Sequence, residues 1–197
     1  YVEDESRPFL TVARRDAQLL LRVHGSADFV VDTGGETITC TPLPTCPIGS
    51  VEQLLVDQII ARVMQLHGRP CLHASAVALR DAAIAFIGPT GSGKSTMTAA
   101  FCHQGAMLIC DDCLSLQVSA EEVLAFPGYP SVRLWPDSAD AVTGDAKTLP
   151  LASPRAAKLR AAQPHRQEQT RLRMIVSLEP TVGLTSCELI TGTDAYL

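Results

Sequence analysis

Short apolar runs alternate with turn residues over the first part of the chain, from residue 8 to residue 43. Runs of this length, bounded by residues such as Gly and Asp, are typical of strands. The predicted strands cover residues 9–13, 18–23, 28–31 and 37–40. We expect a small antiparallel sheet at the edge of the fold that serves as scaffold, because no catalytic constellation falls within it.

A helical period follows the proline-rich connection at residues 42–47. Apolar side chains recur along one face of a helix predicted over residues 51–66. Ser50 and Gln53 match an S-x-x-Q capping box at its start, and Gly68 followed by Pro70 would end it. The apolar face consists of Val51, Leu54, Leu55, Ile59, Val63 and Leu66.

The middle of the chain predicts strands on either side of a helix. Residues 71–79 and 82–87 are expected to form a hairpin, and residues 95–104 a helix that ends at Gly105. The apolar run at 106–110 is the next strand, and Asp111 and Asp112 follow it directly. A strand–helix–strand unit leaves its two strands parallel, so both aspartates are expected at the sheet edge where the strand 82–87 ends.

The last third of the chain mixes short strands with a stretch that is poor in apolar side chains. Residues 143–170 are rich in Pro, Gln, Ala and basic residues, which predicts a long mobile loop acting as a basic lid over a substrate. Its basic side chains are Lys147, Arg155, Lys158, Arg160 and Arg166, with Arg171 close by. The other predicted elements are strands over 114–118, 122–126, 171–178 and 186–190, a short apolar stretch at 132–135, and helices over 136–142 and from 193 onward.

Residues 88–95, G-P-T-G-S-G-K-S, match the phosphate-binding pattern G-x-x-x-x-G-K-[ST] at every fixed position. Glycines allow the backbone N–H groups to turn inward around a phosphate chain, and the helix that follows directs its N-terminus at the same place. Lys94 supplies a charge for the outer phosphates, and the Ser95 hydroxyl is suited to Mg²⁺. The predicted nucleotide-binding residues are Gly88, Pro89, Thr90, Gly91, Ser92, Gly93, Lys94, Ser95 and Thr96.

Asp111 and Asp112 also point to a phosphate site, because two adjacent acids at the end of a buried strand are costly without a cation. One of them holding Mg²⁺ while the other takes up protons is the favoured interpretation; capping of a turn is the alternative. His73 precedes the hairpin strand that ends at the loop, and both a core role and a functional role stay open for it.

Composition limits the classes of partner. The chain has 197 residues, a net charge of −5 and a mean hydropathy of +0.15, so neither nucleic acid nor a membrane is an expected partner. Seven cysteines and no secretory signal indicate reduced thiols in the cytoplasm. Cys110 and Cys113 have C-x-x-C spacing, but Cys40 and Cys46 do not supply the second pair of a zinc site, so buried thiols are expected.

His73, the loop at 88–95 and the strand that ends in Asp111 and Asp112 together resemble the core of the HPr kinase/phosphorylase family of bacterial serine kinases. The resemblance is most specific over residues 71–135. It implies an α/β fold with a P-loop kinase core of the HPr kinase C-terminal-domain type, related to the nucleotide domain of PEP carboxykinase. That core has a mixed sheet with flanking helices, here preceded by the small antiparallel sheet.

The resemblance also implies roles for single residues. Lys94 would stabilise the transferred phosphoryl group of ATP or GTP, and Ser95 with Asp111 would bind Mg²⁺. Asp112 would accept the proton of the acceptor hydroxyl, and His73 would orient the reacting groups. These roles agree with phosphoryl transfer as a matter of positioning and charge neutralisation.

The chain departs from the longer members of that family in two places. Residues 126–131, F-P-G-Y-P-S, lack the metal-binding acid of the family's E-I-R-G-L-G-like stretch, which argues against phosphorolysis and a second metal. Arg171 is the suggested counterpart of the family's later catalytic arginine. The shorter relatives include kinases that modify the precursors of lasso peptides.

An ATP-dependent kinase acting on a serine of a protein or peptide is the leading hypothesis, and a flexible peptide tail is the expected acceptor rather than free serine. A small-molecule kinase and a nucleotide-binding sensor without turnover are the alternatives. A homo-oligomer is left open. We expect one compact domain with a β-rich portion at 1–48 and the kinase core at 49–197. Because the chain starts with Tyr1, the natural polypeptide is expected to continue in at least one direction.

Overall fold

An antiparallel four-stranded sheet forms the N-terminal part of the chain. The computed structural model describes residues 9–16, 18–154, 157–179, 186–188 and 190. The strands of this sheet lie in chain order and confirm the predicted sheet. They are β1 (Leu10–Arg15), β2 (Gln18–Val23), β3 (Ala27–Asp32) and β4 (Ile38–Pro42).

One continuous helical segment follows, and it begins three residues earlier than the pattern predicts. It consists of α1 (Ile48–Leu54), a π-helical turn η1 (Leu55–Ile59) and α2 (Ile60–Leu66). The predicted capping box is wrong: Pro47 is the N-cap and has no capping side chain, and the Ser50 hydroxyl is buried without a hydrogen-bond partner. Ser50 lies inside the first turn, where its N–H already donates to Pro47 O at 2.9 Å.

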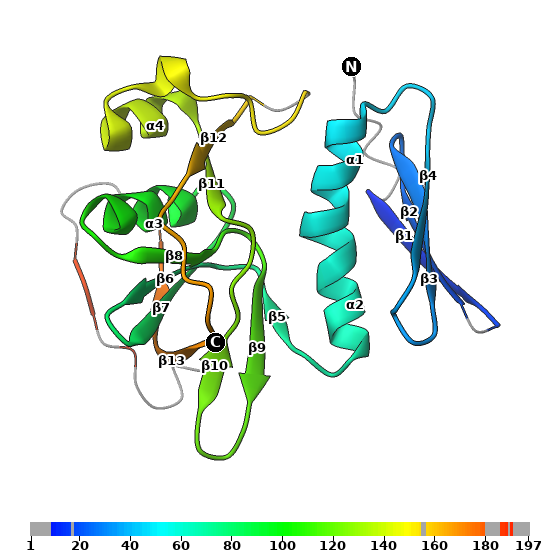
Figure 1. The fold of residues 1–197 in the computed structure, drawn as a ribbon, viewed down its shortest axis with the longest axis horizontal. Coiled ribbons are helices and arrows are strands. Elements are labelled where there is room, and N and C mark those ends of the chain that lie inside the picture. Colours follow the sequence, from blue (N-terminus) through cyan, green and yellow to red (C-terminus); the bar gives the residue numbers. More distant parts are fainter. Residues whose placement is uncertain (1–8, 17, 155–156, 180–185, 189, 191–197) are drawn as a thin grey trace.

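The helical segment packs on the N-terminal sheet. Val51, Ile59 and Val63 share a buried cluster with Phe29 and other sheet residues. Figure 1 shows the helix standing between this sheet and the remainder of the molecule, so that its opposite face is turned toward the second sheet. The predicted division of the chain after residue 48 stays a prediction. The helical segment that follows residue 48 shares a buried cluster with the N-terminal sheet.

The second sheet has seven strands in the order β5-β9-β10-β13-β7-β6-β8, and it is mixed. The predicted hairpin is present as β6 and β7, and β8 pairs antiparallel with β6. The predicted strand 71–79 is wrong as a single strand: it is interrupted at residues 73 and 74, and β5 pairs with β9 instead. Consequently β7 and β8 run parallel with one strand between them, which confirms that both end at the same edge. The strands are β5 (Cys71–Leu72), β6 (Ser75–Leu79), β7 (Ala82–Ile87), β8 (Met107–Cys110), β9 (Leu114–Val118), β10 (Val123–Ala125) and β13 (Thr170–Ser177).

Two helices and a short strand pair cover one face of the second sheet (Figure 1). The helices are α3 (Lys94–His103) and α4 (Pro136–Thr143), and the pair is β11 (Ser131–Leu134) with β12 (Leu159–Ala162). Phe86, Leu108 and Val132 from the strands form one buried cluster with Ala99 and Cys102 of α3. This packing fixes the start of α3 against the ends of β7 and β8. The molecule is therefore a mixed α/β structure.

The predicted mobile loop at 143–170 is wrong for the described residues. The segment contains a 3-10 turn, η2 (Ala146–Thr148), and β12, which pairs along its whole length with β11. Leu108 donates to Pro164 O at 2.7 Å and accepts from Arg166 N at 2.8 Å, which ties the segment to β8. Although the segment is polar in composition, Ala161 is buried and Leu159 packs against the same cluster, which stabilises the strand.

Near the C-terminus the predicted strand at 186–190 is wrong where it can be checked, because residues 186–188 and 190 have no regular secondary structure. The predicted helix start at 193–195 lies outside the described residues. Within the described part of the chain, no helix combines the length and the apolar character needed to span a membrane.

Candidate functional site

The glycine loop joins the end of β7 to the start of α3, as the pattern predicts. Its glycines take positive φ values of 144° at Gly88, 85° at Gly91 and 93° at Gly93. A Cβ atom on Gly88 would lie 2.4 Å from the carbonyl oxygen of Leu178, so this position requires glycine on steric grounds as well. Gly91 and Gly93 face open space, which leaves the concave side of the loop accessible.

Lys94 folds back over the loop. Its side chain is buried, and its ammonium group donates to Gly88 O at 2.8 Å and to Pro89 O at 3.0 Å. These hydrogen bonds keep the positive charge of Lys94 next to the glycine loop. A buried ammonium satisfied only by neutral carbonyls is well placed to exchange them for phosphate oxygens, which are charged acceptors.

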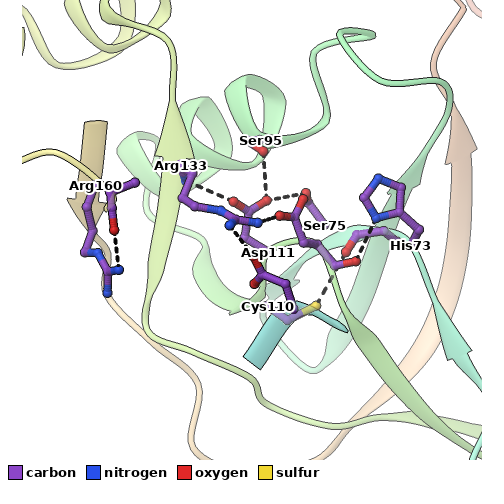
Figure 2. A network of polar contacts seen from close by, with 11 residues as sticks. His73, Ser75, Ser95, Cys110, Asp111, Arg133 and Arg160 are labelled. Carbon is purple, nitrogen blue, oxygen red and sulfur yellow. Dashed lines mark hydrogen bonds and ion pairs between the residues drawn. The ribbon is translucent and has the colours of Figure 1, made fainter. Parts of the chain in front are cut away.

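The carboxylate of Asp111 is the centre of the polar network drawn in Figure 2. Ser95 Oγ donates to its Oδ1 at 2.8 Å, and Ser75 Oγ donates to the same oxygen at 2.6 Å. The backbone N–H of Arg133 donates to Oδ2 at 2.9 Å. The structure therefore brings together the two residues that the sequence predicts as metal ligands, one from the first turn of α3 and one from the end of β8.

Asp112 lies in the turn that follows, in a backbone conformation that non-glycine residues rarely adopt. Its φ is 71°, and its carboxylate forms an ion pair with the guanidinium of Arg133. The Nδ1 atom of His73 lies 3.1 Å from the backbone oxygen of Asp112 and forms a hydrogen bond with it. Left-handed conformations of this kind cost about 1–3 kcal/mol and persist where the surroundings over-determine them. The ion pair and the histidine bond supply that constraint.

The charge state of His73 follows from its surroundings. Partial burial of the ring is the largest cause that lowers the pKa of His73 below its ordinary value of 6.5, and the nearby positive charge of Lys94 lowers it further. Asp111 acts in the opposite direction and raises that pKa. His73 is therefore neutral at pH 7. Its Nδ1–H donates to the backbone oxygen of Asp112, which leaves Nε2 as an acceptor.

Arg133 and Asp57 are site residues that the sequence does not reveal. Arg133 belongs to β11 and pairs with Asp57 of the π-helical turn as well as with Asp112. Its side chain is 15% exposed and that of Asp57 is 20% exposed, so both charges are largely removed from water. A charged residue within the apolar stretch 132–135 was the available signal for Arg133, whereas nothing local marks Asp57.

Arg171, the suggested counterpart of the later arginine, is placed wrongly for that role. It pairs in register with Ala82 at the start of β7, whereas the glycine loop follows the end of that strand. Its side chain instead pairs with Glu122 and donates to Glu121 O at 3.1 Å. Arg133 is the arginine that reaches the aspartates.

The oxygen donors beside the glycine loop suit a Mg²⁺ ion that is bound together with phosphates. Among the described residues there is no group of three or more His, Cys, Asp or Glu side chains that could hold a metal. Mg²⁺ at a nucleotide site needs fewer protein ligands, since it is bound by one or two protein oxygens together with phosphate oxygens and water. Ser95 Oγ and Asp111 Oδ1, which lie 2.8 Å apart, fit that requirement.

The cysteines near the site behave as buried thiols. Burial raises the pKa of Cys110 well above its ordinary value, and burial followed by the neighbouring Cys71 raises the pKa of Cys113 to about 12. Thiols with such values stay protonated at neutral pH and are poor metal ligands. All seven cysteines are free.

Comparison with solved structures finds a likeness to a kinase. The solved structure of the HPr(Ser) kinase/phosphatase from Coxiella burnetii is similar to this chain with a TM-score of 0.37 and 16% sequence identity. The match covers 54% of this chain, and the chain spans 63% of the length of that structure. No protein-family model matches the chain, and no curated protein sequence matches it. The likeness is partial in both chains, so the case for a function rests on the geometry of the residues described above.

Proposed function

We propose that this chain is a Mg²⁺-dependent kinase that transfers the γ-phosphoryl group of ATP to a serine of a protein or peptide. The observation that carries the proposal is the contact between Ser95 Oγ and Asp111 Oδ1 at 2.8 Å, directly beside the loop that holds Lys94. The ammonium and hydroxyl at the start of α3 and the carboxylate at the end of β8 are the groups that a nucleotide's phosphates and their cation require.

The binding step uses the loop and the first turn of α3. Backbone N–H groups of residues 88–96 would surround the phosphates, and Lys94 would leave the Gly88 and Pro89 carbonyls for phosphate oxygens. Ser95 and Asp111 would hold Mg²⁺, which when bound neutralises charge on the phosphates. Ser75 keeps Asp111 in place by donating to the same carboxylate oxygen at 2.6 Å.

The transfer step uses the second aspartate. The acceptor serine Oγ attacks the γ-phosphorus, the bond from that phosphorus to the bridging oxygen breaks, and ADP leaves with the bond's electron pair. The proton of the serine hydroxyl goes to the carboxylate of Asp112, which the ion pair with Arg133 holds in place. His73 holds the Asp112 turn through its backbone oxygen.

Transfer of labelled phosphate tests this function. The purified chain is incubated with γ-labelled ATP, Mg²⁺ and serine-containing peptides or candidate precursor peptides, and the products are identified by mass spectrometry. A mass gain of one phosphate on serine is expected, and it should vanish when Mg²⁺ is removed by a chelator. Release of phosphate to water alone, with no acceptor modified, would contradict a kinase.

A further inference from the structure

A cavity of about 440 Å³ lies between the helical segment and the loop before β11, and it borders the candidate site. Asp111 and Arg133 form one side of this cavity, and Val56, Ile60 and Met64 of the helix form the other. A cavity of this size is typical of sites that bind a ligand. Since Asp111 also contacts Ser95, a molecule in this cavity lies next to the position expected for the nucleotide's phosphates.

The helix side of the cavity carries an apolar strip of Val56, Ile60 and Met64, none of which belongs to a buried cluster. Glu52, Gln53 and Asp57 of the same segment line the cavity beside this strip, and the Asp57 carboxylate is paired with Arg133. Val56 is 37% exposed and Ile60 is 39% exposed, whereas Ile59 and Val63 on the opposite face are buried against the N-terminal sheet. Phe126 adds an aromatic ring to the lining. Val56, Ile60 and the half-buried Met64 recur every fourth position, so they form a strip about 12 Å long on an α-helical rise.

Arg160 provides a positive charge in the same cavity. Its guanidinium donates to Tyr129 Oη at 2.6 Å and to Ala152 O at 2.7 Å, both of which are neutral acceptors. Among the described residues no carboxylate pairs with it, in contrast to Arg133. Figure 2 draws Arg160 on the side of Arg133 that faces away from Asp111. An anionic group bound at Arg160 is therefore separated from the reacting carboxylates.

One further polar group of the lining has no partner. The Ser115 hydroxyl is buried and makes no hydrogen bond with any described residue. A buried hydroxyl without a partner costs free energy that a ligand in the cavity can recover. The cavity thus offers an apolar strip, one unmatched cation and one free hydroxyl.

We propose that this cavity is the acceptor pocket and that it takes a peptide in which large apolar and acidic side chains flank the phosphorylated serine. This inference rests on the proposed kinase function. The strip of about 12 Å is the length of three to four extended residues, which favours a peptide segment over free serine. The apolar side chain packs on Ile60 and Val56, and the acidic one pairs with Arg160. The serine hydroxyl lies at the end of the cavity formed by Asp111 and Arg133, within reach of Asp112, which pairs with Arg133 and takes the proton.

Positional scanning of a peptide library tests the pocket. Peptides with a central serine and one fixed flanking residue at a time are incubated with the whole chain and Mg²⁺-ATP, and phosphate incorporation is measured. We expect at least a fivefold preference for Asp or Glu at one flanking position and for a large apolar residue at another. Arg160→Gln should lose the acidic preference, and Arg160→Lys, which keeps the charge, should retain most of it. Ile60→Ser should weaken the apolar preference.

Arg173→Gln is the matched control, because Arg173 is exposed on β13 and does not line the cavity. It should keep both preferences.

Retention of Mg²⁺-ATP affinity within twofold in Arg160→Gln would show that the variant is folded. Phosphorylated peptides with the same preferences in wild type and Arg160→Gln would overturn the pocket while the kinase function stands. Transfer to free serine or another small alcohol but to no peptide would also overturn the pocket, and absence of transfer to any acceptor would overturn both proposals.

Discussion

Arg133 connects β11 both to the turn after β8 and to the helical segment. Its backbone N–H donates to Asp111 at 2.9 Å, and its guanidinium pairs with Asp112 and Asp57. A strand that presents its N–H to one aspartate and its side chain to the next fixes both carboxylates at once. The two aspartates consequently differ in environment: Asp111 faces hydroxyls and an amide, and Asp112 faces a full positive charge.

Replacement of Asp112 separates binding from chemistry. In Asp112→Asn the amide cannot accept the serine proton, so phosphoryl transfer should fall by a factor of about 100 or more. Nucleotide affinity, measured by calorimetry, should stay within a few-fold because Ser95 and Asp111 are intact. Loss of Mg²⁺-nucleotide binding together with normal transfer in the remaining complex would instead assign Asp112 to the metal.

Thiol reactivity tests the surroundings of Cys102 in α3 and of Cys113 after β8. Burial raises the pKa of Cys102 to about 11, and burial with the neighbouring Cys71 raises the pKa of Cys113 to about 12. At pH 8 a thiol with a pKa of 11 is ionised in about one molecule in a thousand, so alkylation is slow. Iodoacetamide followed by peptide mapping should label the exposed Cys187 first and Cys102 and Cys113 much more slowly. Equally rapid labelling of Cys113 would contradict a buried protonated thiol.

At the scale of elements, the order strand, glycine loop, helix, strand was predictable because each part leaves a local mark. Gly88 and Gly93 mark the loop, Gly105 marks the end of α3 with a φ of 96°, and the apolar run before Asp111 marks β8. The start of the helical segment was not predictable, since Ser50 has the residue type of a cap but lies inside the helix. The strand β12 was not predictable either, because its stability comes from pairing with β11, which is distant in sequence.

Gly88 is the point where the loop meets β13, and its replacement tests that packing. In Gly88→Ala the new Cβ would meet Leu178 O at 2.4 Å and Ser92 Oγ at 2.7 Å, in addition to the unfavourable φ of 144°. We expect a loss of about 3 kcal/mol or more in unfolding free energy, measured by urea denaturation. Gly144→Ala is the control, because Gly144 has a φ of 72° but nothing within 4 Å of an added Cβ. It should cost only about 1–2 kcal/mol, and equal losses in both variants would contradict the predicted clash.

At the scale of the whole molecule, the N-terminal part and the part built on the second sheet are joined across the cavity. The N-terminal sheet and the helical segment share one buried cluster, and the second sheet with α3 and α4 forms others. The ion pair between Asp57 and Arg133 links the helix to β11 across this boundary. The sequence predicts both parts from their patterns but not this link, because the π-helical turn that carries Asp57 has no local signature.

Removal of Asp57 tests the link between the cores. Asp57→Ala leaves a largely buried guanidinium with one carboxylate fewer, and the unfolding free energy should fall by about 1–3 kcal/mol. Glu52→Ala on the same helix is the control, since Glu52 is exposed and a surface change of this kind costs within about 0.5 kcal/mol. Chemical denaturation measures both. Equal stability of Asp57→Ala and the wild type would mean that the ion pair does not hold the two parts together.

Calorimetric titration of Mg²⁺-ATP into the wild type and Lys94→Ala tests the central claim, that the loop at 88–95 binds a nucleotide's phosphates. The wild type should bind with one site per chain and lose affinity when Mg²⁺ is withheld. Lys94→Ala should lose most of the affinity, because the ammonium now held by Gly88 O and Pro89 O is the charge that meets the phosphates. Lys147→Ala, which removes an exposed lysine, is the control and should bind normally. Equal affinity of the wild type and Lys94→Ala would contradict the account.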